Sequence, residues 1–194
     1  MSKTATSITG AVILSVLLLG LQAAQAAEVF APRFDLPALD GKRYSNRYLM
    51  GKPTLVVFWA SWCPVCQVEL PKLHALFEAA RGRGLQVFAI GFADELDKIR
   101  HYVQSHGEIF DFPVLYDNGD VVAKRFGVVG TPTIYLINRR GEIEYVTWLI
   151  EDPALADKLE KILAAPRSSG SEAFNAYHAL PETESFQPVI FPLL

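Results

Sequence analysis

The chain contains two cysteines, Cys63 and Cys66, at the point where an apolar run gives way to a helical pattern. Residues 55–58 are apolar and typical of a buried strand. The apolar residues that follow repeat at the spacing of one helix face: Leu70, Leu73, Phe77 and Ala80. The pattern therefore predicts a strand, a turn and a helix. We expect Cys63 at the exposed N-terminus of this helix and Cys66 one turn inside it, pointing toward the core.

The expected position of Cys63 favours thiol–disulfide chemistry. Free N–H groups and the helix dipole stabilise negative charge at the first turn, and the thiolate is the nucleophilic form of cysteine. We expect Cys63 to attack a client disulfide and Cys66 to resolve the mixed disulfide. A structural disulfide is a poorer interpretation because so short a loop gains little stability. A zinc site is poorer because no second Cys pair or His-x-x-His completes four ligands.

Residues 1–26 have the pattern of a secretory signal peptide. Lys3 lies near the start, residues 11–21 are mostly apolar, and Ala24-Gln25-Ala26 fits a cleavage site. An uncleaved membrane anchor is the alternative, since residues 8–27 approach the length of a membrane span. Export predicts a periplasmic protein, in a compartment where disulfides are made and exchanged.

Residues 27–165 are long enough for one domain with its own core. The formal net charge is −3 and no basic cluster is present, so we expect no nucleic-acid partner. Residues 166–194 form a C-terminal extension that includes the linker-like stretch 167–171 and ends in the apolar stretch 189–194. We expect the extension to be flexible; docking of its apolar end on the domain or on a partner is the alternative.

The order of predicted elements indicates an α/β fold. An entry segment at 31–52, with a turn at Asp40-Gly41, precedes the strand and helix of the cysteine motif. A strand at 85–90, a helix at 94–105, a short extended piece at 112–116 and a short helix ending at Gly127 follow. Residues 133–137 and 142–148 have a hairpin signature. Asp152 and Pro153 are expected to cap and begin the last helix.

The motif Trp-Ala-Ser-Trp-Cys-Pro-Val-Cys at residues 59–66, with Glu69 and Pro71 after it, resembles the TlpA-like thioredoxins, which include ResA and CcmG (DsbE). The similarity covers about residues 31–164. It implies a thioredoxin fold, with a central mixed sheet flanked by helices and an extra N-terminal strand or hairpin. It also implies a periplasmic thiol-disulfide oxidoreductase without a cofactor. Its implied clients are disulfide proteins such as apocytochrome c in cytochrome c biogenesis, and its implied electron donor is a membrane thiol reductase of the DsbD or CcdA type.

The resemblance also implies where clients bind. Thr131-Pro132 matches the cis-proline loop of thioredoxins, which faces the cysteine helix and offers a backbone edge to a client strand. Trp62, Pro64 and Val65 surround the cysteines and are expected to contact clients with Thr131. An ordinary trans proline is the alternative for Pro132.

The same resemblance implies that Asp94 exchanges protons with the buried cysteine, because Asp94 matches a family carboxylate near that residue. A helix N-cap is the equally weighted alternative for Asp94. Cytoplasmic thioredoxins carry a buried aspartate in the central strand, whereas this chain has Val57. Asp94 is therefore the nearest candidate for the proton role.

Three functions are compatible with the sequence: a disulfide reductase, an oxidase or isomerase, and a copper-binding thiol chaperone. Pro64 slightly favours an oxidase of the DsbA type, but the segment between Cys66 and Pro132 has no room for the helical insertion of those enzymes. Copper chaperones of this fold use a different cysteine spacing and a distant histidine. We expect no metal site, because the four histidines have no ligand spacing and are expected to be solvated: His74, His101, His106 and His178.

Overall fold

The computed structural model describes residues 29–166, so the expected signal peptide and most of the C-terminal extension lie outside the described residues. Its centre is a five-stranded sheet in the order β5-β4-β3-β6-β7. The parallel strands are β3 (Thr54–Trp59), β4 (Gln86–Gly91) and β5 (Val114–Tyr116). The antiparallel strands are β6 (Thr133–Ile137) and β7 (Ile143–Thr147). All residues of β3 are buried, as expected for a central strand.

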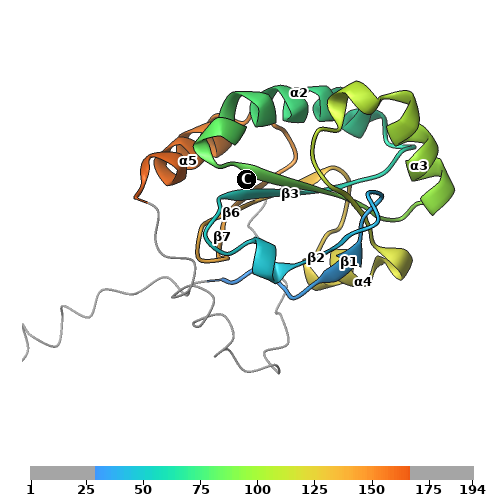
Figure 1. Cartoon of the computed structure of the whole chain (residues 1–194), viewed down its shortest axis with the longest axis horizontal. Helices are drawn as coiled ribbons and strands as arrows, with labels where there is room; N and C mark the ends of the chain where they lie inside the picture. The colour runs from blue at the N-terminus through green and yellow to red at the C-terminus, as the bar shows by residue number, and fades with distance from the viewer. Residues whose placement is uncertain (1–28, 167–194) are drawn as a thin grey trace, which may run out of the picture.

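Helices cover both faces of this sheet (Figure 1). One face packs against α2 (Pro64–Ala80), α3 (Leu96–Ser105) and α5 (Pro153–Ala164). The other face packs against α4 (Val121–Arg125) and a hairpin of β1 (Asp35–Pro37) and β2 (Arg43–Ser45). Short 3₁₀ turns complete the described chain: η1 (Asn46–Tyr48), η2 (Arg81–Arg83), η3 (Gly107–Ile109) and η4 (Asn118–Asp120). None of the helices within residues 29–166 is both long and apolar enough to cross a bilayer.

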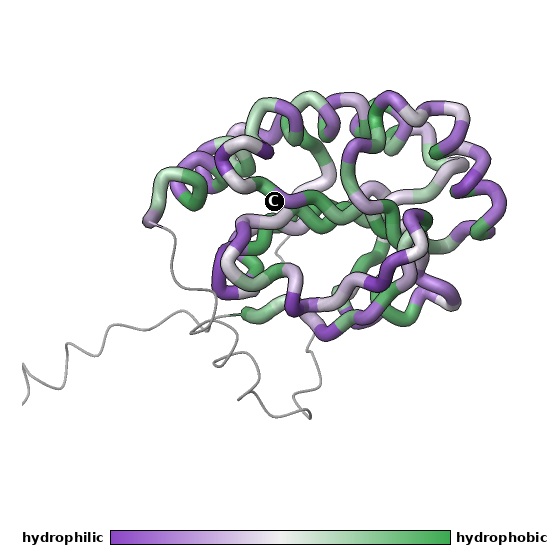
Figure 2. The backbone as a smooth tube through the Cα atoms, in the orientation of Figure 1, coloured by the Kyte–Doolittle hydropathy of each residue, from purple (hydrophilic) through white to green (hydrophobic). Residues whose placement is uncertain are grey.

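The core divides into two apolar layers because side chains alternate along the strands. In β3, Leu55, Val57 and Trp59 join the layer under α2 and α5, whereas Val56 and Phe58 join the layer under the hairpin. Figure 2 shows the sheet as a mainly hydrophobic band between more polar outer segments. Each fully buried large apolar side chain stabilises the folded state by about 1.5–3 kcal/mol. Burial therefore stabilises the position of β3, the strand that leads into the cysteine motif.

The structure confirms the expected thioredoxin order and the additional N-terminal element. That element is a two-stranded hairpin whose turn places Gly41 at a φ of +82°, a conformation that glycine adopts without a Cβ clash. Asn46 fixes the chain before the hairpin. It is buried, accepts a 2.6 Å hydrogen bond from the Phe34 nitrogen and donates a 2.9 Å bond to the Pro32 carbonyl oxygen. The last helix begins at Pro153 with Asp152 as its cap, as expected.

Candidate active site

Cys63 is the N-cap of α2, and Pro64 is the first residue of the helix, a position that suits proline because its missing N–H would have no helical partner. The Cys66 nitrogen donates a 3.2 Å hydrogen bond to the Cys63 sulfur. The expected strand, turn and helix are therefore confirmed. One expectation was wrong: Cys63 is only 3% exposed rather than at an exposed tip. The loop before β6 lies against it, and the Cys63 thiol is 3.4 Å from the Thr131 carbonyl oxygen.

Cys66 points into the core, as expected, and is 1% exposed. Its sulfur lies 3.1 Å from the Thr131 hydroxyl oxygen, which in turn donates a 3.3 Å hydrogen bond to the Phe58 carbonyl oxygen. Because the hydroxyl has a single proton, the Cys66 thiol is the donor to Thr131 in this arrangement. The pKa of Cys66 is raised to about 12. Burial is the largest cause, the contact with Cys63 also raises the pKa, and a hydrogen bond from the Thr131 hydroxyl to the thiolate lowers it. Both cysteines are free thiols.

The Thr131–Pro132 peptide bond is cis, which confirms the expected conformation of this loop. Thr131 is the residue that contacts both sulfurs, through its carbonyl oxygen to Cys63 and through its hydroxyl to Cys66. Pro132 is buried beside them. The fold thus brings the cysteine helix and this distant loop together at the ends of the neighbouring strands β3 and β6.

A buried carboxylate, Glu69, shares a small pocket with Cys66. Glu69 is 5% exposed, and its Oε2 accepts a 2.7 Å hydrogen bond from the Ile150 nitrogen. Its Oε1 accepts a 2.9 Å bond from Lys72. The remaining lining of the pocket is apolar: Val57, Trp59, Leu70, Leu73, Pro132, Ile134 and Ile150. Glu69 is therefore a carboxylate fixed in an otherwise apolar space beside the buried thiol.

Glu69 is a candidate functional residue that was not predicted from the sequence, although the helical spacing contains a signal for it. Cys66, Leu70 and Leu73 mark the buried stripe of α2, and Glu69 lies on the same side of the helix, three residues after Cys66. Charged side chains are almost never fully buried unless they are paired, so a glutamate within a buried stripe marks a candidate functional group. Val57 lies in the same pocket, at the position where cytoplasmic thioredoxins carry an aspartate.

Asp94 lies beside the turn that precedes Cys63. Its Oδ2 accepts a 2.7 Å hydrogen bond from the Ser61 nitrogen, and its Oδ1 accepts a 2.8 Å bond from the Glu95 nitrogen. The N-cap interpretation was wrong by one residue, because the N-cap of α3 is Glu95, without a side-chain capping bond. The chain turns sharply before Asp94, with Ala93 at a φ of +50°, so the carboxylate reaches back to the cysteine turn instead.

The surface around the cysteines is apolar and open. Trp62 is 57% exposed, although its indole nitrogen donates a 2.9 Å hydrogen bond to the Ala93 carbonyl oxygen. Pro64 and Val65 are exposed on the first turn of α2, and Val129 is exposed in the loop before Thr131. The expected client-contacting residues thus lie in the turn before α2, in the first turn of α2 and in the Thr131 loop, which border the buried sulfurs.

The histidines were expected to be solvated, and this expectation was wrong for two of them within the described chain. His106 is half-buried, stacks on Tyr102 at a centroid distance of 4.2 Å and lies 2.9 Å from the Tyr102 carbonyl oxygen. His74 is half-buried on α2, and its Nδ1 is shielded from water. His101 is exposed, as expected, and His178 lies outside the described residues.

Comparison with known proteins yields one matching family and a consistent group of relatives. The AhpC/TSA family matches residues 28–146. Thiol-disulfide oxidoreductase ResA from Bacillus thuringiensis is 32% identical over 114 residues, which cover 58% of this chain and 64% of the relative. ResA from Bacillus subtilis is 28% identical over 133 residues, covering 68% of this chain and 73% of the relative. The chain thus spans slightly less than two thirds of the first of these relatives.

Solved structures agree with the fold. A protein from Neisseria meningitidis assigned to the thioredoxins has a TM-score of 0.64 and 32% identity, with 75% of this chain and 97% of that chain covered. A thiol:disulfide interchange protein of the thioredoxin family from Chlorobium tepidum has a TM-score of 0.62 and 26% identity, with 73% and 100% covered. The thioredoxin-like fold inferred from the motif is therefore shown.

Proposed function

This chain belongs to the AhpC/TSA family, and we propose that it is a thiol-disulfide oxidoreductase that reduces the disulfides of client proteins outside the cytoplasm. The observation that carries this proposal is the contact of both cysteine sulfurs with one loop residue. Cys63 lies at the N-terminus of α2, where the Cys66 N–H points at its sulfur. Thr131 contacts both thiols and lies in a loop bordered by exposed apolar side chains.

The proposed reaction transfers two electrons to the client. The Cys63 thiolate attacks one sulfur of the client disulfide, the client S–S bond breaks, and the other client sulfur leaves as a thiolate that takes up a proton. The Cys66 thiol then loses its proton and attacks the Cys63 sulfur. The mixed disulfide breaks and the second client thiol is released. The client disulfide is reduced, and Cys63 and Cys66 become oxidised to a disulfide.

The second step needs a proton acceptor, because burial holds the pKa of Cys66 far above neutrality. We propose Glu69 for this role, since its carboxylate lines the same pocket as Cys66. Asp94 was the sequence-based candidate, but it does not line the pocket that contains Cys66, and its carboxylate accepts backbone N–H bonds from Ser61 and Glu95. We propose that Asp94 acts as a positioning residue, which holds the turn before Cys63.

The proposal also covers the cellular compartment of the protein, its electron donor and clients, and the direction of electron transfer. Residues 1–26 have the signal-peptide pattern, which supports export to the periplasm, and residues 27–165 form the proposed catalytic domain. Because that compartment is oxidising, sustained reduction needs an external electron source, for which a membrane thiol reductase is the proposed donor. Proteins with disulfides, apocytochrome c among them, are the proposed clients.

Trapping a mixed disulfide tests this function. With Cys66→Ser, the first step proceeds and the second stops, so the client stays attached to Cys63. We expect mass spectrometry of complexes isolated from the periplasm to identify attached proteins that release under reductant. The matched control is Cys63→Ser, which should trap almost nothing because Cys66 points into the core and its raised pKa leaves almost no thiolate at neutral pH. Absence of complexes with Cys66→Ser, or equal trapping by both variants, would contradict the proposal.

A further inference from the structure

We propose that His74, Glu78 and Asp111 form a binding site for a divalent transition-metal ion of the Zn²⁺ class. His74 and Glu78 lie on α2, and Asp111 lies in the segment between η3 and β5. One potential ligand atom of each residue lies within 4.8 Å of the others. Among residues 29–166 this is the single group of three such side chains.

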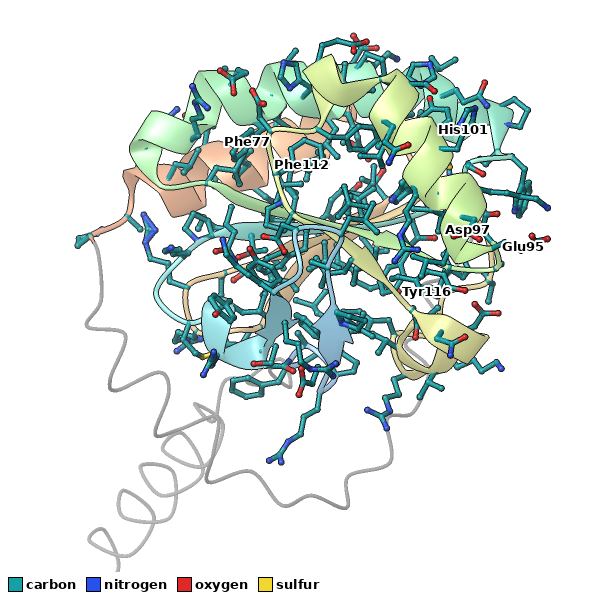
Figure 3. The ribbon with its side chains drawn as sticks, turned by 45° about the vertical axis from the view of Figure 1, so that its right-hand side comes forward. Phe77, Glu95, Asp97, His101, Phe112 and Tyr116 are labelled. Atoms are coloured by element: carbon teal, nitrogen blue, oxygen red, sulfur yellow. The ribbon has the colours of Figure 1, made fainter. Side chains whose placement is uncertain are left out.

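Helical spacing brings His74 and Glu78 together, and packing between α2 and a distant segment adds Asp111. His74 and Glu78 are four residues apart in a helix, so their side chains share one face. Asp111 is brought to this face by its neighbour Phe112, whose ring meets Phe77 of α2 edge-on at a centroid distance of 5.5 Å. Figure 3 shows the labelled Phe77 and Phe112 side chains directed toward one another across this junction.

An unpartnered atom points to a ligand at this place. His74 Nδ1 is shielded from water and has no hydrogen-bond partner. Buried polar atoms in folded proteins are nearly always bonded, and a bound water or a bound ion explains many of the exceptions. Imidazole nitrogen is also the commonest protein ligand of such metals. His74 therefore has an unused ring nitrogen, and one of its two ring nitrogens lies within 4.8 Å of the carboxylate oxygens.

The donor set selects the class of ion. One imidazole and two carboxylates suit Zn²⁺ and neighbouring transition ions, whereas Ca²⁺ and Mg²⁺ prefer oxygen ligands alone. Bonds of about 2.0–2.2 Å to a tetrahedral ion separate its ligand atoms by about 3.4 Å. The present separations of up to 4.8 Å need only small side-chain rotations to reach that value. Glu78 also pairs with Arg81 at 3.1 Å, so Arg81 competes with the ion for this carboxylate.

This site is distinct from the redox site. At a rise of about 1.5 Å per residue, His74 lies about 12 Å along α2 from Cys66, and none of its three residues lines the pocket shared by Cys66 and Glu69. A bound ion would connect α2 to the segment that leads into β5. We therefore assign it a structural effect, the stabilisation of the α2–Asp111 junction, with no part in the thiol chemistry.

Direct metal titration tests the site. The probe is Zn²⁺, and the protein is the tag-free chain with Cys63→Ser and Cys66→Ser, so that thiols bind no metal. We expect calorimetry to find one strong site. His74→Ala and Asp111→Asn in this background should each weaken binding at least about tenfold, since even outer-shell changes at metal sites cost about 10–100-fold.

A matched control is available on α3. Asp97 and His101 also lie four residues apart on a helix, are exposed and have no third ligand within the described chain (labelled in Figure 3). Asp97→Asn and His101→Ala should leave zinc affinity unchanged. Zinc should also raise the Tm of the cysteine-free protein, and this rise should vanish with His74→Ala. No binding in the cysteine-free protein, or binding that the two site variants leave intact, would overturn the proposal.

Discussion

The Oε2 atom of Glu69 accepts a 2.7 Å hydrogen bond from the backbone nitrogen of Ile150, 81 positions later in the chain. The other oxygen pairs with Lys72 at 2.9 Å, and Lys72 also reaches Glu151 at 2.7 Å. The carboxylate is therefore held in one orientation at the wall of the pocket that contains Cys66. This fixed position is the basis for the first prediction.

Glu69→Gln should slow the resolving step of the reaction and spare the first step. Glutamine keeps the shape of Glu69 and can still accept the Ile150 bond, but it cannot take a proton from Cys66. A positioned proton acceptor contributes about 10²–10⁴-fold, so we expect resolution of a Cys63 mixed disulfide to slow about 100-fold at pH 7. Rapid-quench measurement with a disulfide peptide separates attack by Cys63 from resolution by Cys66.

Asp94→Asn is the matched comparison for Glu69→Gln. Asparagine cannot accept both backbone bonds of Asp94, from Ser61 and Glu95. The main effect of Asp94→Asn should therefore be a decrease of about 1–3 kcal/mol in the free energy of unfolding. The pH dependence of Cys66 reactivity should change less than it does with Glu69→Gln. A larger change in that profile with Asp94→Asn would return the proton role to Asp94.

Removing the Thr131 hydroxyl should also weaken Cys66 as a nucleophile. When Cys66 loses its proton, the Thr131 hydroxyl can donate to the thiolate instead of to the Phe58 carbonyl oxygen, which lowers the thiol pKa. Loss of this hydroxyl in Thr131→Val should therefore raise that pKa. A hydrogen bond contributes about 0.5–1.5 kcal/mol, which predicts a resolving step about 2- to 10-fold slower. Thr131→Ser keeps the hydroxyl and serves as the control in the same rapid-quench assay. Equal rates for the two variants would show that the hydroxyl has no influence on Cys66.

The reduced protein should lose stability in alkali because of Cys66. Burial raises its pKa from the ordinary 9.0 to about 12, so the folded state keeps a proton that the unfolded state releases. Unfolding therefore becomes easier as the pH rises from about 9 toward 12, by up to about 1.4 kcal/mol per pH unit. Urea denaturation of the reduced protein at pH 8–10.5 measures this slope.

Two controls isolate the contribution of Cys66 to that slope. Burial also raises the pKa of Tyr135 to about 12, so part of the alkaline loss is common to all forms. The oxidised protein and Cys66→Ser lack the Cys66 thiol and should show a shallower slope than the reduced protein. The same slope in all three forms would mean that Cys66 titrates normally in the folded state.

The parts of the structure that sequence analysis predicted depend on local patterns. The apolar run of β3 and the stripe of α2 are periodic, so they placed Cys63 and Cys66 at the junction of a strand and a helix. Asp152 and Pro153 carry the chemistry of a helix start, and the last helix begins there. The cis conformation of Pro132, by contrast, came from a family resemblance and is not a consequence of local pattern.

The parts that the sequence did not predict arise from contacts between distant segments. Cys63 is buried because Thr131, 68 positions later, lies against its sulfur. Glu69 becomes a fixed carboxylate through Ile150. His74 and Asp111 come within 4.8 Å of each other at the junction where Phe77 and Phe112 pack together. Each pairing depends on tertiary packing, which the periodicity of a single segment does not report.

Two structural features support the proposed direction of electron flow, from this protein to its clients. Strong oxidants of this class owe their potential to a stabilised reduced form. Burial disfavours the thiolate of Cys66, so the reduced form gains no stability from a charge at that position. The segment between α2 and β6 consists of β4, α3, β5 and α4 with short turns, so it contains no inserted helical domain of the kind found in dedicated oxidases.

We therefore predict that Cys63 and Cys66 are held mostly as free thiols in the cell. An oxidising compartment would convert them to a disulfide, so a membrane donor must return electrons as fast as clients remove them. Acid quenching of intact cells followed by thiol alkylation measures the ratio of the two forms. Deleting the membrane thiol reductase should shift the pair to the disulfide, and restoring that reductase should reverse the shift. A pair that is oxidised in unmodified cells, in a protein that rapidly oxidises reduced model substrates, would instead identify an oxidase.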